Sequence, residues 1–93
     1  MGALTEEAIR RGTQEIVFAM APVPAAATDA DLDLVDGLGY HSLALLELAY
    51  ALEDEYELPP IDQESAQRIK RVSDVADYVV AQVREHAASG ESA

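Results

Sequence analysis

Residues 36–48 read DGLGYHSLALLEL, and this segment decides how the rest of the chain is interpreted. Gly37 and Gly39 give the backbone freedom just before a run with helical spacing. Ser42 opens that run and has the residue type that favours an N-cap position. Free N–H groups and the helix dipole at such a position also favour a negatively charged phosphate. An ordinary capping serine is the alternative, so the flanking sequence has to decide between the two.

The helix that begins at Ser42 is expected to run to about Tyr56, before Pro59 and Pro60 stop it. At about 100° per residue, its apolar side chains fall on two faces. The face predicted to enter the core carries Leu45, Leu48, Ala49, Leu52 and Tyr56. A second apolar strip carries Leu43, Leu46 and Tyr50, with Glu47, Glu53 and Asp54 beside it. Apolar residues rimmed by acids are typical of a docking surface for a basic partner. Alternatively, Leu46 and Tyr50 cover a neighbouring loop.

Helical signals also precede and follow this segment. Thr5, followed by two acids, predicts an N-cap. The helix after it has an apolar stripe formed by Ile9, Thr13, Ile16, Val17 and Met20, and it ends before Pro22 and Pro24. A long loop, from about residue 21 to 41, follows. Four of its apolar residues are predicted to pin it to the core, in part through a short helical turn: Leu32, Leu34, Val35 and Leu38.

Two further helices are predicted near the C-terminus. The first is short, over Asp62–Gln67, and the second begins at Ser73 as N-cap and runs to about His86. The buried stripe of the last helix is Ala76, Val79, Val80 and Val83. We therefore expect an all-α four-helix bundle over residues 1–87, with three main helices, one short helix and a long loop between the first two main helices. The small polar residues 88–93 are expected to form a disordered tail.

The composition narrows the possible partners. Eighteen acidic and six basic residues give a net charge of −12, so neither nucleic acid nor an anionic membrane is expected as a partner. No cysteine is present, which removes disulfides and cysteine nucleophiles. No apolar run approaches the ~20 residues of a membrane span, and the opening residues lack an apolar signal core. We expect a cytoplasmic monomer.

The segment Gly39-Tyr-His-Ser-Leu, with the following Ala-Leu-Leu-Glu, resembles the phosphopantetheine attachment motif of acyl carrier proteins. The resemblance continues in residues 52–56, 60–62 and 69–79, and it covers roughly residues 5–86 in the same order. It implies that Ser42 receives 4′-phosphopantetheine from coenzyme A through a separate, Mg²⁺-dependent phosphopantetheinyl transferase. The arm then carries acyl groups as thioesters, and the chain itself is not an enzyme.

The same resemblance implies which surface meets the partner enzymes. These would be an acyltransferase, a ketosynthase or tailoring enzymes with basic docking patches. The implied contacts are Leu43, Glu47, Tyr50, Glu53 and Asp54, and we add His41 beside the attachment serine. The helical projection selects the same strip from the residues alone.

A few sequence positions indicate which type of carrier the chain resembles. Leu38–Glu47 is most similar to the discrete carriers of type II polyketide synthases. His41 departs from that pattern, which usually has Asp, and His-Ser-Leu is typical of peptidyl carriers. Ala44 replaces an acid common in fatty-acid carriers, which disfavours that role. A discrete peptidyl or aminoacyl carrier of nonribosomal peptide synthesis and a helical interaction module without an arm remain the alternatives.

Catalytic and metal sites are not predicted. The Gly-x-Ser-x-Gly elbow of hydrolases is absent around Ser42. Asp29, Asp31 and Asp33 alternate as at the start of a calcium loop, but the glycine and glutamate that an EF-hand needs further along are missing. No cluster of ligand residues surrounds either histidine.

Overall fold

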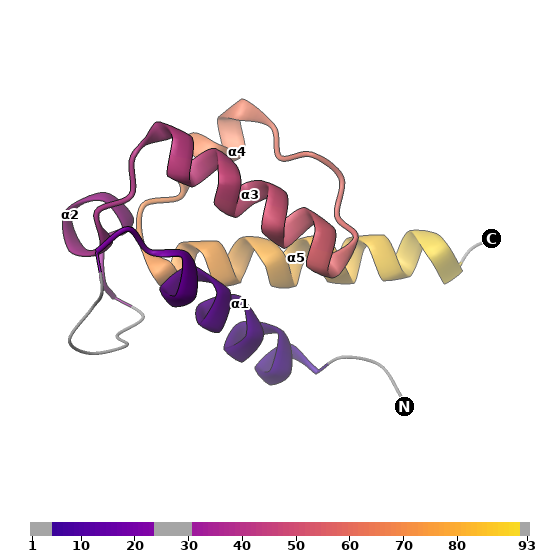
Figure 1. Cartoon of the computed structure of the whole chain (residues 1–93). Helices are drawn as coiled ribbons and strands as arrows, with labels where there is room; N and C mark the ends of the chain where they lie inside the picture. The colour runs from indigo at the N-terminus through magenta and orange to yellow at the C-terminus, as the bar shows by residue number, and fades with distance from the viewer. Residues whose placement is uncertain (1–4, 24–30, 92–93) are drawn as a thin grey trace.

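The computed structural model of the chain describes residues 5–23 and 31–91, and the regular elements in these ranges are helices (Figure 1). In chain order they are α1 (Glu6–Met20), α2 (Leu34–Leu38), α3 (Ser42–Tyr56), α4 (Gln63–Arg68) and α5 (Val72–Glu91). The predicted all-α bundle is confirmed. The long helices are α1, α3 and α5, and the loop between α1 and α3 contains a short helix of its own.

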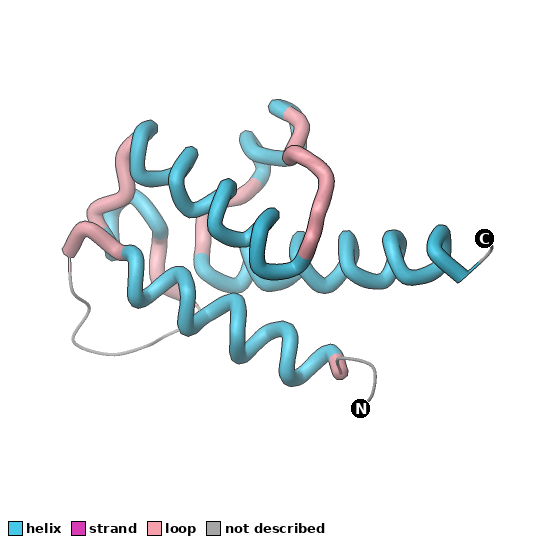
Figure 2. Tube along the Cα trace, turned by 45° about the vertical axis from the view of Figure 1, so that its right-hand side comes forward, coloured by secondary structure: helices cyan, strands magenta, loops and turns pink. Residues whose placement is uncertain are grey.

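The three long helices pack on one another, with α1 in contact with both α3 and α5. Both views place α2 at the end of the bundle where α3 begins (Figures 1 and 2). The short α4 follows the loop that leaves the other end of α3. The start of α3 therefore lies next to α2 in the loop that leads into it.

Local signals set most helix ends as predicted. The Thr5 hydroxyl accepts a hydrogen bond from the Ala8 N–H at 3.1 Å, which caps α1. Asp62 does the same for α4, accepting from the Ser65 N–H at 3.3 Å. The first helix ends at Met20, just before a proline.

Two predictions for α5 are wrong. The helix begins at Val72, so Ser73 lies inside it and is not its N-cap. The Asp74 carboxylate instead accepts hydrogen bonds from the N–H groups of Lys70 and Arg71, both at 3.0 Å. An acid in the first turn that reaches back to the N-cap N–H is one half of a capping box. At the other end the helix continues to Glu91, beyond the predicted end near His86.

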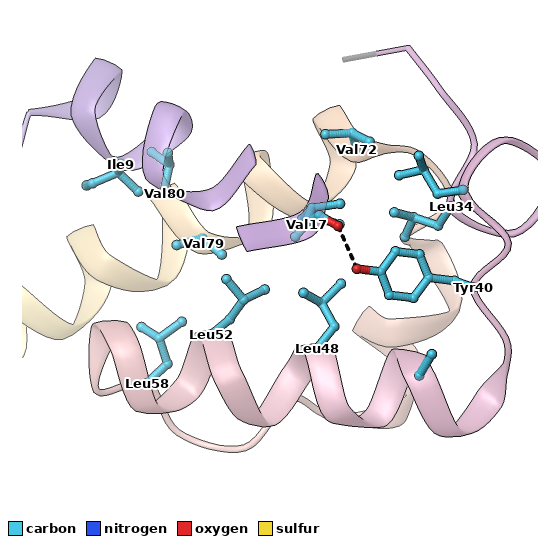
Figure 3. Packing of buried hydrophobic residues seen from close by; sticks show 13 residues of the cluster. Ile9, Val17, Leu34, Tyr40, Leu48, Leu52, Leu58, Val72, Val79 and Val80 are labelled. Atoms are coloured by element: carbon cyan, nitrogen blue, oxygen red, sulfur yellow. Dashed lines mark hydrogen bonds between the residues drawn. The ribbon is translucent and has the colours of Figure 1, made fainter. Parts of the chain in front are cut away.

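The core lies between α1, α3 and α5, with contributions from α2 (Figure 3). Its buried hydrophobic residues are Ile9, Val17, Leu34, Leu38, Tyr40, Ala44, Leu48, Leu52, Leu58, Val72, Val75, Ala76, Val79 and Val80. The face of α3 predicted to be buried is confirmed in Leu48 and Leu52, while Leu45 is half-buried. Helical periodicity thus identified most of the core.

The segment between α1 and α3 is pinned to the core by α2 and by backbone hydrogen bonds. Leu34 donates to the Lys70 carbonyl at 2.9 Å, and Val72 donates to the Leu32 carbonyl at 3.0 Å. Leu34 and Leu38 are buried as predicted. Val35, predicted to be a core contact, is 58% exposed, because in this single helical turn it lies on the side away from the core.

Tyr40 is among the largest fully buried side chains, and its hydroxyl donates a hydrogen bond to the Val17 carbonyl at 2.7 Å (Figure 3). The Val17 carbonyl belongs to the last turn of α1, where carbonyls lack an intrahelical partner. Burial raises the pKa of Tyr40 to about 12. This contact joins the end of α1 to the residue two positions before Ser42.

No helix in the described part of the chain is long and apolar enough to cross a membrane.

Replacing Tyr40 by Phe should lower the free energy of unfolding by about 1–3 kcal/mol, because the Val17 carbonyl stays buried without a partner. Urea unfolding measures this loss.

The folded state also keeps a phenol proton on Tyr40 that an ordinary tyrosine, with a pKa near 10, gives up. The stabilisation by Tyr40 should therefore be complete below about pH 10 and be lost as the pH rises towards about 12. A pH dependence in this window that Tyr40→Phe leaves unchanged would contradict this assignment, and Tyr50→Phe, at an exposed tyrosine, is the matched control.

Candidate functional site

Ser42 is the first residue of α3, and it is exposed. The predicted N-cap position of Ser42 is wrong by one residue, since His41 occupies it with an extended backbone (φ −127°, ψ 178°). The His41 carbonyl accepts from the Leu45 N–H at 2.8 Å, and its ring Nδ1 accepts from the Ala44 N–H at 3.4 Å. The imidazole therefore caps the helix, which leaves the Ser42 hydroxyl free of the capping role.

The backbone before Ser42 is held by a tight turn at the end of α2. Gly39 has φ +75°, which an L side chain rarely adopts, and its N–H donates to carbonyls of α2. A Cβ added at Gly39 would also collide with the Val23 side chain. The next residue, Tyr40, is buried and hydrogen-bonded. Ser42 thus projects from a fixed junction between a loop and a helix.

The N-terminal turn of α3 is suited to a phosphate. The N–H groups of Ser42 and Leu43 precede the first intrahelical hydrogen bond and are free to donate. The first turn contains no acid, although the chain carries a net charge of −12. A phosphodiester on Ser42 would therefore meet backbone donors and the positive end of the helix dipole without a neighbouring carboxylate in that turn.

The apolar strip predicted on α3 is exposed. Leu43, Leu46 and Tyr50 are 60%, 47% and 59% exposed, so Leu46 and Tyr50 are not buried under the preceding loop. Glu47 and Asp54 are exposed as well. Among the described residues, no ion pair involves an acid of α3, since the arginines pair with acids on α1, α4, α5 and with Asp33. The acids beside the strip are therefore available to a partner.

Glu53 departs from the predicted arrangement. Its side chain is only half-exposed, and its carboxylate accepts a hydrogen bond from the Ile61 N–H at 3.2 Å. Glu53 therefore binds the loop between α3 and α4 and is not simply an exposed acid of the strip.

An apolar cavity of about 130 Å³ lies between α3 and the segment from Leu58 to α5. Its walls are almost entirely hydrocarbon, and they are formed by Leu34, Leu45, Leu48, Ala49, Leu52, Glu53, Leu58, Ile61, Ala66, Ile69, Val75 and Tyr78. Leu45 follows Ser42 by one helical turn, so part of the cavity wall lies one turn from the serine. The sequence alone did not predict it.

Two wall residues, Glu53 and Tyr78, bring polar groups to this cavity. Burial raises the pKa of the Tyr78 phenol, and the nearby carboxylates of Asp62, Glu53 and Glu85 raise it further. The phenol is therefore protonated at neutral pH and available as a hydrogen-bond donor.

No group of three or more histidine, aspartate or glutamate side chains in the described residues is placed to hold a metal ion. Asp29, one of the alternating acids considered for calcium, lies outside the described residues.

Comparison with known proteins identifies the family. The chain is 35% identical over 72 residues to an acyl carrier protein of Bdellovibrio bacteriovorus, covering 77% of this chain and 91% of the relative. It is 34% identical over 77 residues to an acyl carrier protein of Thermobifida fusca, covering 83% and 96% of the two chains. The chain belongs to the acyl carrier protein family. The names of these relatives specify no polyketide pathway.

A solved acyl carrier protein from Thermotoga maritima has the same fold as this carrier. The TM-score is 0.67 at 24% sequence identity, and the match covers 86% of this chain and 92% of the other. A scan against protein-family models found no match.

The structure brings together most of the site residues predicted for this acyl carrier protein. Ser42 and His41 lie at the start of α3, and the strip continues along its exposed side to Asp54. The contact that the prediction missed is the one between Glu53 and Ile61. A signal for it was present, because two consecutive prolines leave the Ile61 N–H as the first donor available after Leu58.

Replacing His41 by Ala should lower the free energy of unfolding of the carrier by about 0.5–1 kcal/mol, because the Ala44 N–H loses its cap. His41→Asn supplies another capping acceptor and should restore most of this stability. Urea unfolding of the three proteins measures the difference. Equal stability of the wild type and the alanine variant would show that the imidazole does not cap α3.

Proposed function

We propose that this protein carries acyl groups as thioesters on a 4′-phosphopantetheine arm attached to Ser42, and that it delivers them to enzymes of a polyketide pathway. The observation that carries the proposal is the exposed Ser42 in the first turn of α3, close behind the buried Tyr40. Membership of the acyl carrier protein family supports the carrier part. The polyketide part rests on the resemblance of residues 38–47.

The residues at the start of α3 fit the arm. The N–H groups of Ser42 and Leu43 would donate to the phosphate oxygens, and no acid of the first turn opposes its charge. The arm supplies a thiol for thioester chemistry, which this cysteine-free chain lacks. On modification, the Ser42 oxygen forms a bond to the phosphorus that carries the pantetheine of coenzyme A and gives up its proton, while the pyrophosphate bond breaks and adenosine 3′,5′-bisphosphate leaves. We assign the base to the transferase, because His41 Nδ1 accepts from the Ala44 N–H.

The apolar cavity supports a hydrocarbon part in the cargo. One of its wall residues, Leu45, lies one helical turn from Ser42, and its walls are almost free of polar atoms. Transfer of an apolar chain from water into such walls is favourable by about 0.8 kcal/mol for each buried CH₂ group. Part of an acyl chain would therefore lie in the protein between encounters with partner enzymes.

The partner enzymes would dock on the exposed strip of α3. We propose that Leu43 and Tyr50 supply the apolar contact, and that Glu47 and Asp54 meet a basic patch on the partner. His41 is exposed at the same end of the helix, beside Ser42, and would meet the partner's active-site entrance. Glu53 would contribute less, because its carboxylate is bound to Ile61.

Local roles of two residues and the lack of an acid at the start of α3 bear on the choice of pathway. The burial and hydrogen bond of Tyr40 explain that residue without reference to any pathway. His41 likewise has a local role as helix cap. The absence of an acid from the first turn of α3 disfavours a fatty-acid role by the family pattern. A discrete peptidyl or aminoacyl carrier is the second candidate, favoured by the His-Ser-Leu segment.

Incubation with coenzyme A and a broad-specificity phosphopantetheinyl transferase should add one phosphopantetheine to the wild-type chain and none to Ser42→Ala. Mass spectrometry of the intact protein measures the addition. An unmodified wild type under conditions that load another carrier would reject the proposal in favour of a helical interaction module. Loading with malonyl or with aminoacyl groups would then separate the two carrier types.

Reversing the charges of Glu47 and Asp54 to lysine should slow acyl transfer to a partner enzyme roughly tenfold or more, because opposite charges steer and orient the encounter. Rates measured at low salt, together with circular dichroism to verify the fold, test this. Glu15→Lys is the matched control, since it reverses an exposed acid on α1. Equal rates for the strip variants and the control would remove the docking role of the strip.

A further inference from the structure

The loop between α3 and α4 forms one wall of the apolar cavity, and little holds it to α3. Leu58 at its start is buried, and its N–H donates to the Glu53 carbonyl at 2.9 Å. Pro59 and Pro60 follow, and neither has an N–H. In the described part of the chain, the hydrogen bond from the Ile61 N–H to the Glu53 carboxylate is the one that joins the rest of this loop to α3.

The two residues of this hydrogen bond both line the cavity. Glu53 is a wall residue on α3, and Ile61 is a wall residue on the loop. A carboxylate on an otherwise hydrocarbon wall is costly unless it is hydrogen-bonded, and the Ile61 N–H provides that bond. The same contact therefore satisfies the carboxylate and closes the loop against the helix.

We propose that Glu53 determines the length of hydrocarbon chain that the cavity admits, by fastening the loop across it through the Ile61 N–H. With the loop in this position, the cavity is partly open to solvent and measures about 130 Å³. A cavity of about 150 Å³ lined by apolar side chains is known to hold a benzene molecule. A chain of roughly six carbon atoms is therefore the most that fits before the loop has to move. The end of a longer chain stays in water unless the hydrogen bond between Glu53 and Ile61 breaks.

What the limit on chain length means for the cargo rests on the proposed acyl-carrier function. The limit itself is a property of the unmodified chain. Within a carrier, Glu53 would act as a specificity-determining residue. Short or compact acyl groups would be held without any change of the loop, and long aliphatic chains would be disfavoured.

The first measurement is amide hydrogen exchange at Ile61 by NMR on the unmodified chain. Glu53→Ala should accelerate exchange at Ile61 roughly tenfold, because the amide loses a charged acceptor. Glu53→Gln keeps a side-chain oxygen and should remain close to the wild type. Glu55→Ala is the matched control, an exposed acid on the same helix that makes no bond to the loop. Unchanged exchange in Glu53→Ala would overturn the fastening role.

The second measurement is the binding of straight-chain alcohols from butanol to decanol, followed by the methyl signals of Leu48 and Val75 in the cavity wall. Affinity should rise roughly fourfold with each added CH₂ group while the chain fits. In the wild type and in Glu55→Ala this rise should stop near six carbons, and in Glu53→Ala it should continue to longer chains. The same limit in all three proteins would overturn the proposal. Both measurements are made without the arm, so a failure of Ser42 to accept phosphopantetheine would be seen separately.

Discussion

The hydrogen bond from the Tyr40 hydroxyl to the Val17 carbonyl, at 2.7 Å inside the core, is the contact on which the position of Ser42 depends. It uses a carbonyl that the end of α1 leaves without an intrahelical partner. It also fixes the chain two residues before the attachment serine. An exposed residue on an unanchored loop would take many positions, and ordering it on partner binding would cost conformational entropy. Because Tyr40 is buried, the backbone beside Ser42 is already ordered before a partner binds, and this entropy cost does not arise on binding.

The helix α3 divides its surface between folding and recognition. Its buried side carries Leu48 and Leu52, and its exposed side carries Leu46 and Tyr50. Five of the six basic residues of the chain pair with acids outside α3, so the acidic residues of that helix meet no cation within the described structure. Within the described residues, the negative charge that disfavours binding to nucleic acid and membranes therefore stays unpaired on α3, where a basic partner would bind.

Much of the fold and of the candidate site followed from local sequence patterns. The stripe with Ile9 and Val17 identified the core face of α1, and the two faces of α3 were separated by helical spacing alone. The errors occurred where side chains compete for a cap. Ser42 and Ser73 are both good N-cap residues by type, but His41 caps α3 and Asp74 reaches back to cap α5. Residue type does not say which of several neighbouring acceptors reaches the free N–H groups.

The sequence by itself determined the helical bundle, the serine at the start of α3 and the acid-rimmed strip, because each depends on residue type and on spacing within one segment. Only the tertiary structure decided that Tyr40 is buried against α1, that Val35 is exposed, and that Glu53 holds the loop through Ile61 beside an apolar cavity. These features join segments that are far apart in the chain or separated by a turn. Their geometry depends on how the helices pack, and periodicity within a helix carries no information about that.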